Sequence, residues 1–315
     1  MSIITVPNIT QIGKVEPYIS VETFKDDPLS NSLDLSQLVE GGSQSAQDSA
    51  IQRMIYRASA KIDNHTCGPT GTLNATLIPL QGQSFVNREG CVTVNPGQPR
   101  LLGITQAQWA YQMGAWSEIP IDKYHAFVEE TTVRLKIGGA TGTIQFGGIG
   151  DLSALFQNRN MNGKVYVNYT VLAGWPNTFT SSASGTAGGY TLTVNDATGF
   201  ELQDQYGNGM EATIWDGIGT ETNFVSSVSG NVITFTSPLL YNHGFGVNVT
   251  TLPASVQQAC MHFIIGMVKS RGQGGIVISS DGSAEAVGSR ADAISNDEAL
   301  AYDLLDQFTA TWGRA

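Results

Sequence analysis

The sequence predicts an α+β protein, in which a core of three helices and a small antiparallel sheet is interrupted by an inserted all-β domain, a barrel or a sandwich. Three observations lead to this prediction. Apolar residues recur at three- and four-residue spacing in three separate segments, strand-like alternation follows the first of these segments, and a Gly- and Ser-rich stretch precedes a second set of short strands.

The clearest predicted helix covers residues 252–271. One apolar stripe runs along it, formed by Val256, Ala259, Cys260, Phe263, Ile264, Met267 and Val268. Pro253 suits the first turn, and Gly272 suits a left-handed cap after the last turn. We therefore expect a helix that buries one face against another helix.

Two further segments carry the same spacing. Residues 45–66 begin with a capping box at Ser45 and continue with Ile51, Met54, Ile55, Ala58 and Ile62. Residues 295–308 begin with a second capping box at Ser295 and continue with Leu300, Ala301, Leu304, Leu305 and Phe308. We predict that the helices at 45–66 and 252–271 pack together. The residues expected in their contact are Ile51, Met54, Ile55, Phe263, Ile264 and Met267.

Strand-like alternation defines the rest of the chain. Segments 91–94, 132–137 and 164–169 predict the small sheet that covers the helices. Five short strands are expected between residues 190 and 250, after the Gly- and Ser-rich linker 181–189. The predicted parts are an extended N-terminal arm at 1–43 with a short helical turn near 33–38, a first core segment at 44–178, the inserted β domain at 179–250, and a second core segment at 251–315.

Composition limits the classes of function. The chain has 315 residues, with 27 acidic against 16 basic side chains and a formal net charge of −11, so a sequence-independent grip on phosphates is not expected. An acidic wall that repels DNA is compatible with this charge. The three cysteines form no C-x-x-C pair, which argues against a structural zinc site. Folding in a reducing compartment is the simpler interpretation of such scattered cysteines. The chain carries no signal-peptide pattern and no apolar run of membrane-spanning length.

The sequence carries no catalytic motif, and we predict no catalytic residue, cofactor or metal site. His262 is expected on a helix flank and His243 in a turn. The Gly-rich run 138–150 lacks the following helix that a nucleotide site needs, and the loop with Asp281 and Glu285 departs from calcium-binding spacing. The tryptophans indicate core or interface packing more than a sugar site.

Taken in order, several segments resemble the head-to-tail connector (adaptor) proteins of tailed bacteriophages. The resemblance rests on residues 50–68, 164–176, 252–272, 285–288 and 298–308. A helix ending in a polar-Gly corner, a strand running into Gly-Trp, and a Leu-Pro helix ending in Arg-Gly recur in this order in that family. The chain departs from the family in its long N-terminal arm and in the inserted β domain, which itself resembles β modules on phage structural proteins.

The resemblance implies a non-enzymatic virion subunit. Such a protein forms a ring, expected to be a dodecamer, binds the portal protein and the tail or tail-completion proteins, and lets DNA pass through its lumen without sequence-specific binding. It would be made in the bacterial cytoplasm and act at the neck of the virion, away from any membrane. The resemblance also places the C-terminal segment against the portal, which makes Phe308, Trp312 and Arg314 the expected docking residues, although Trp312 folding back onto its helix is equally compatible with the sequence.

Two other functions remain open at this stage. The inserted β domain suits a glycan- or receptor-binding module on the virion, anchored by the helices. A hydrolase with a cleft built from scattered Asp and Glu residues is the third hypothesis, without a motif to support it.

Overall fold

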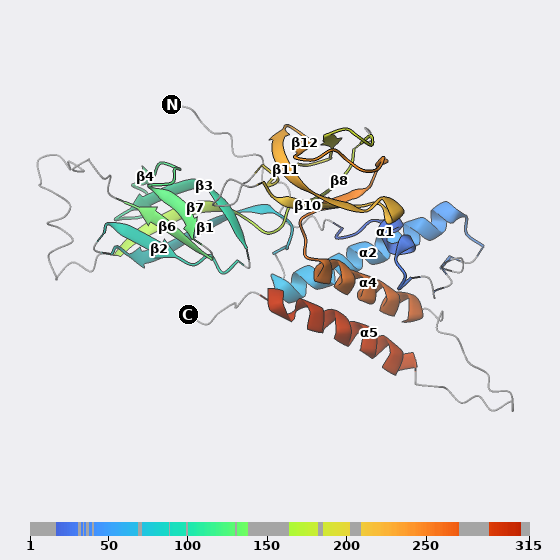
Figure 1. Cartoon of the computed structure of the whole chain (residues 1–315). Helices are drawn as coiled ribbons and strands as arrows, with labels where there is room; N and C mark the ends of the chain where they lie inside the picture. The colour runs from blue at the N-terminus through green and yellow to red at the C-terminus, as the bar shows by residue number, and fades with distance from the viewer. Residues whose placement is uncertain are drawn as a thin grey trace, which may run out of the picture. The chain divides into compact units, whose positions relative to one another are not determined.

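The computed structural model describes residues 17–137 (except 31, 32, 34, 36, 37, 40, 69, 70, 88, 99 and 130), 164–181, 185–201, 209–270 and 290–309, the last range with side chains from residue 296 onward. These residues form a mostly β protein with three antiparallel sheets and four α-helices (Figure 1). The predicted α+β class, a three-helix core covered by one small sheet, is therefore wrong.

The helices are α1 (Val21–Asp26), α2 (Gln44–Thr66), α4 (Ala254–Val268) and α5 (Arg290–Leu305), which continues into the 3-10 helix η4 (Asp306–Phe308). Both predicted capping boxes are displaced. Ser43, with extended backbone, caps α2 by accepting from the N–H of Ala46, so Ser45 already lies in the first turn. α5 begins at Arg290, so Ser295 lies within the helix, because residues with good helix propensity precede it.

The helices share one hydrophobic cluster, here called the helical cluster. The residues predicted to join α2 to α4 lie in it, with Ile51, Met54, Ile55, Phe263 and Ile264 buried and Met267 partly buried at its edge. Ala301 and Leu305 of α5 belong to the same cluster. Tyr18, Ile19 and Phe24 also fill it, so the described part of the predicted arm belongs to the core. The arm carries the helix α1 at Val21–Asp26, which the sequence did not predict, and Leu35, within the predicted turn near 33–38, has 3-10 helical backbone.

Residues 75–174 form a unit of their own, with two sheets. One sheet has the order β1-β7-β3-β4, with strands Thr76–Phe85, Lys164–Ala173, Leu101–Ala110 and Ser117–Glu118. The other has the order β2-β6-β5, with strands Cys91–Val94, Thr132–Lys136 and Ala126–Glu129. Alternate residues of β7, such as Val165 and Val167, fill a core shared by both sheets. The apolar faces of the two sheets therefore cover each other within this unit, so the strands predicted as one small sheet over the helices belong to two sheets that share a core of their own.

The third sheet forms the β module, residues 177–250. Its order is β8-β13-β10-β11-β12-β9, with strands Asn177–Phe179, Asn248–Thr250, Glu211–Trp215, Glu221–Ser229, Val232–Phe235 and Thr191–Thr193. The sheet curls into a half-barrel, because an antiparallel bridge between Thr180 and Val194 joins its two edges. Leu192, Ile214 and Ile233 lie in the core that this curvature encloses.

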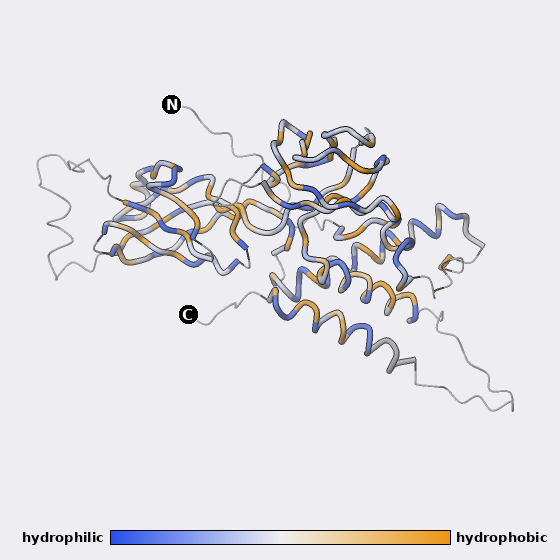
Figure 2. Tube along the Cα trace, in the orientation of Figure 1, coloured by the Kyte–Doolittle hydropathy of each residue, from blue (hydrophilic) through white to orange (hydrophobic). Residues whose placement is uncertain are grey.

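The chain divides into two compact units at Asn74 and Trp175. One contains the helices together with the β module, and the other contains the two sheets of residues 75–174. This division differs from the predicted boundaries at 178 and 250, since β8 begins at Asn177 and the module is bound to the helices. Asn177 Nδ2 donates to the carbonyl of Pro17 at 3.0 Å, and Gln257 Nε2 of α4 donates to Asn248 Oδ1 of β13 at 3.1 Å. Hydrophobic residues occur along the helices and strands of the first unit and along the strands of the second (Figure 2).

Candidate functional site

A pocket of about 550 Å³ lies between the helices and the β module, within one unit of the structure. Three segments line it: the end of α1 and the turn after it, the 3-10 turn η2 (Gly217–Gly219) with its flanking strand ends, and the first two turns of α4. The lining residues are Thr23, Asp26, Asp27, Pro28, Leu29, Trp215, Gly217, Thr220, Ala254, Gln257, Gln258 and Met261. Its size falls in the range of sites for small molecules or short peptide segments.

The charge of the pocket wall is acidic. Asp26 and Asp27 lie at the C-terminal end of α1, and no Lys, Arg or His is among the lining residues. Asp27 Oδ1 accepts from the N–H of Leu29 at 2.8 Å. The carboxylate of Asp26 receives no hydrogen bond or ion pair from any residue that the structure describes, and Lys25 beside it pairs instead with Asp48 at 2.5 Å.

Two buried polar atoms of lining residues have no partner in the described structure: Nε1 of Trp215 and Oε1 of Gln257. Gln257 is 4% exposed, and its amide is oriented by the hydrogen bond from Nε2 to Asn248. Asn248 is fixed in turn, because its Nδ2 donates to Asn177 Oδ1 at 2.9 Å. Buried polar atoms are almost always paired in native proteins, so a lone donor and a lone acceptor in one pocket indicate a place for a ligand or an ordered water.

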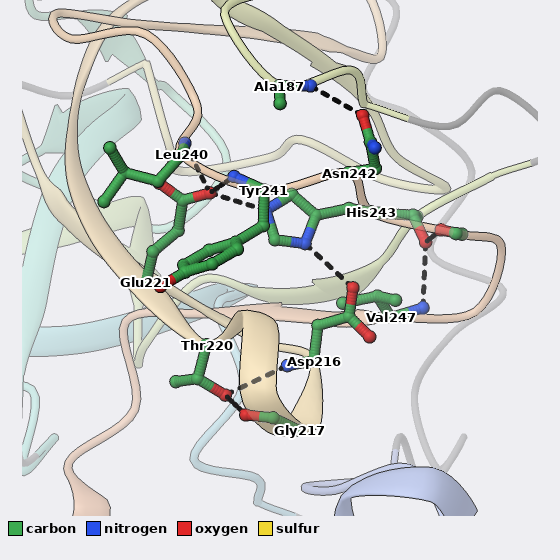
Figure 3. A network of polar contacts seen from close by, with 12 residues as sticks. Ala187, Asp216, Gly217, Thr220, Glu221, Leu240, Tyr241, Asn242, His243 and Val247 are labelled. Carbon is green, nitrogen blue, oxygen red and sulfur yellow. Dashed lines mark hydrogen bonds and ion pairs between the residues drawn. The ribbon is translucent and has the colours of Figure 1, made fainter.

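The η2 side of the pocket is held by a network around His243, here called the His243 clamp (Figure 3). The ring of His243 is fully buried, with Nδ1 at 2.9 Å from Asp216 Oδ2 and Nε2 at 2.7 Å from Glu221 Oε1. The ring donates to both carboxylates only when each nitrogen carries a proton. Asp216 precedes η2 and Glu221 begins β11, so the clamp fixes both ends of the turn.

The clamp also fixes the loop that carries His243. The carboxylate of Glu221 accepts from the N–H groups of Leu240 and Tyr241, at 3.0 Å and 3.3 Å. The backbone N–H of His243 donates to the carbonyl of Gly185 at 2.9 Å. The predicted turn role of His243 is therefore corrected, since its side chain is a buried structural centre whose polar atoms are satisfied inside the module.

The residues singled out in the sequence are distributed over several places. Phe308 lies in η4, where its ring meets Trp175 edge-on with centroids 5.7 Å apart. Trp312 and Arg314 lie outside the described residues, so the docking role of the three residues stays a prediction. His262 is 9% exposed and lies 3.3 Å from Asp297, whose other oxygen pairs with Lys269 at 2.7 Å. This contact joins α4 to α5.

Other sequence features can be placed more briefly. Burial raises the pKa of the Cys67 thiol to about 11 and of the Cys260 thiol to about 12, and Cys91 is partly exposed. The Gly-rich run 138–150, the loop with Asp281 and Glu285, and the cap at Gly272 lie outside the described residues. Within the described ranges, no group of three or more His, Cys, Asp or Glu side chains is placed to hold a metal ion. Sequence reasoning missed the pocket, because its three walls come from distant segments and none carries a local motif.

Comparison of the sequence with models of known protein families and with curated proteins finds no match. In the part of the chain that the structure describes, no helix has the length and apolar character needed to cross a membrane.

Proposed function

We propose that this chain is a structural subunit of a tailed-phage virion, which forms a ring between portal and tail and lets DNA pass through the lumen. One observation carries the proposal: parts of four of the five segments that resemble connector proteins meet in the helical cluster, although they are far apart in the sequence. Residues 50–68 supply α2, the corner 174–176 supplies Trp175, residues 252–268 supply α4, and residues 298–308 supply α5 and η4.

Specific contacts join these segments. The N–H of Trp175 donates to the carbonyl of Leu73 at 2.7 Å, which fixes the Gly-Trp corner beside the end of α2. Phe263 of α4 packs edge-on against Tyr302 of α5 at 5.1 Å. Lys61 of α2 pairs with Glu298 of α5 at 2.7 Å. The resembling segments thus pack against one another in the folded chain, which supports the connector proposal.

The net charge of −11 suits a channel for DNA. A negatively charged lumen repels the phosphate backbone, so DNA passes without being held. This argument concerns the charge of the whole chain and adds to the packing argument without replacing it.

The proposal is tested by mixing the purified full chain with portal rings and imaging the product by electron microscopy. We expect closed rings stacked on the portal, and native mass spectrometry should give about 400 kDa for twelve copies of a 33.5 kDa chain. Full chain that stays monomeric and does not sediment with portal would contradict the proposal. A copy number other than twelve would correct the expected dodecamer while keeping the ring.

A second candidate function is a glycan- or receptor-binding module on the virion, carried by the β module. The observation that favours it is a set of large apolar side chains exposed around the His243 clamp: Ile218 at 99%, Leu240 at 69% and Phe245 at 76%. Exposed apolar side chains on a rigid support are typical of binding surfaces. Binding of the full chain to glycan arrays or to bacterial surface extracts tests this function, with the Phe245→Ser variant expected to bind less.

A further inference from the structure

We propose that the pocket between α1, η2 and α4 binds an arginine side chain from an extended segment of another polypeptide. This inference goes beyond the connector function. It does not rest on that function, because the pocket is formed by residues of one chain and needs neither a ring nor a portal. It rests on the balance of donors and acceptors in the pocket, on its charge and on its apolar walls.

The free polar groups of the pocket call for a ligand rich in hydrogen-bond donors. Asp26 offers a carboxylate that no described residue engages, and Gln257 offers the lone acceptor Oε1. Against these acceptors stands a single unpartnered donor among the buried lining atoms, Nε1 of Trp215. A guanidinium has five N–H donors and no acceptor, so it matches this set, and its planar fork suits a carboxylate.

Electrostatics favour a cation at the same point. Asp26 and Asp27 lie at the C-terminal end of α1, where the helix dipole is itself negative and carboxylates are unfavourable. The neighbouring cation, Lys25, is directed to Asp48 of α2 and does not neutralise them. A positive ligand head group would relieve an arrangement that no described residue compensates.

The apolar walls suit the rest of an arginine side chain. Pro28, Leu29 and Met261 can cover its aliphatic stem, while the guanidinium reaches the carboxylate of Asp26. The indole ring of Trp215 offers a face for the guanidinium, and its N–H can donate to a backbone carbonyl of the bound segment. The two unpartnered atoms are covered in the free chain, so binding requires the side chains that cover them to move aside.

A carbohydrate is the main competing occupant. Sugar hydroxyls act as donors and acceptors in similar number and so need several protein donors. The acidic lining, with its single lone donor, fits a sugar less well than it fits a guanidinium. The experiment therefore compares the two ligands directly.

The test uses the ¹⁵N-labelled full chain and the probe N-acetyl-arginine-N-methylamide. The indole N–H signal of Trp215, assigned with the Trp215→Phe variant, is followed through a titration. We expect this signal to shift in a saturable way, while the indole signals of the other tryptophans stay in place and report an intact fold. The lysine analogue should bind more weakly, and a disaccharide such as maltose should leave the signal unchanged.

Variants identify the groups involved. Asp26→Asn should weaken binding of the arginine probe by about tenfold or more, the effect expected for loss of a charge-assisted hydrogen bond. Gln257→Met should also weaken it. Glu22→Gln is the matched control, because it removes one exposed carboxylate from the same helix at a position that does not line the pocket. The inference is overturned if the arginine probe leaves the Trp215 signal unmoved, if Asp26→Asn binds as tightly as Glu22→Gln, or if the lysine analogue or maltose binds equally well.

Discussion

Replacing Asp63 with asparagine should remove a pH dependence of folding that this one carboxyl group creates. Asp63 lies in α2 and is 7% exposed, and burial raises its pKa to about 6, although hydrogen bonds from Tyr18, Thr72 and the N–H of Leu73 oppose the rise. In the unfolded chain the same group titrates near its ordinary value of 3.8. Between these two values the folded chain binds a proton that the unfolded chain has lost.

The sign follows from this difference. Below pH 3.8, protonated Asp63 makes its full contribution to the free energy of unfolding. This contribution is lost as the pH rises toward 6, because the ionised carboxylate is disfavoured in the buried site. The rise from 3.8 to about 6 corresponds to a loss of about 3 kcal/mol across this window. An amide does not titrate, so the Asp63→Asn variant should lack this loss. Its free energy of unfolding relative to that of the wild type should therefore rise by about 3 kcal/mol between acid and neutral pH.

The assay is urea unfolding of both chains from pH 3.5 to pH 7.5, with the free energy of unfolding compared at each pH. Subtracting the variant from the wild type removes the contribution of the other titrating groups. Asp303→Asn, which changes an exposed carboxylate on α5, serves as the control and should leave the profile of the wild type unchanged. Parallel profiles for wild type and Asp63→Asn would refute the reasoning.

Three further predictions concern packing and the pocket wall. Phe263→Ala should lower the free energy of unfolding in denaturant by about 3 to 5 kcal/mol, because Phe263 is fully buried. Phe85→Ala, at an exposed position, should lower it by less than about 1 kcal/mol, and equal effects of the two variants would contradict the burial of Phe263. His243→Ala should cost about 3 to 5 kcal/mol by leaving Glu221 buried beside an empty site, and hydrogen exchange should quicken at Leu240 and Tyr241; unchanged exchange would contradict the clamp. Gly217→Ala and Gly230→Ala should each cost about 1 to 2 kcal/mol of unfolding free energy, because both residues have positive φ and an added Cβ at Gly217 would meet only the movable end of the exposed Asp26 side chain, 2.6 Å from Oδ2; a cost at Gly217 larger by about 2 kcal/mol or more would show that the Asp26 side chain is held in place.

The long helices could be predicted from the sequence, because the apolar periodicity of a helix is a local pattern. The stripe of Phe263 and Ile264 predicts a buried helix face, and both residues are buried. The N-terminal ends of α2 and α5 were harder to predict. Ser45 and Ser295 match a capping motif, but α2 is capped by Ser43 and α5 begins at Arg290. A capping motif shows that a serine can cap, but the backbone before it decides whether it does.

The sheets show where local reasoning fails. Strand β7 was recognised by its alternation, yet its neighbours β1 and β3 lie far away in the sequence, and pairing depends on those distant partners. The apolar faces of residues 75–174 cover each other, which periodicity alone does not distinguish from covering a helix. The fold class was wrong for this reason.

The candidate site was almost wholly hidden from the sequence. Asp26, Trp215 and Gln257 come from three distant segments, and each residue type is common at surfaces and in cores. His243 was visible as a rare residue type, but its partners Asp216 and Glu221 lie 27 and 22 residues before it, and no motif joins them. A network of this kind depends on the curvature of the sheet, so it becomes visible only once strands β10 and β11 are paired.

The most direct measurement of the central claim is cryo-electron microscopy of virus particles that carry this chain. The connector proposal predicts a closed ring of density at the neck, between portal and tail, into which both units of the chain fit as separate bodies, with DNA or an open channel along the axis. Density for this chain at fibres, at the tail tip or elsewhere away from the neck would contradict the proposal.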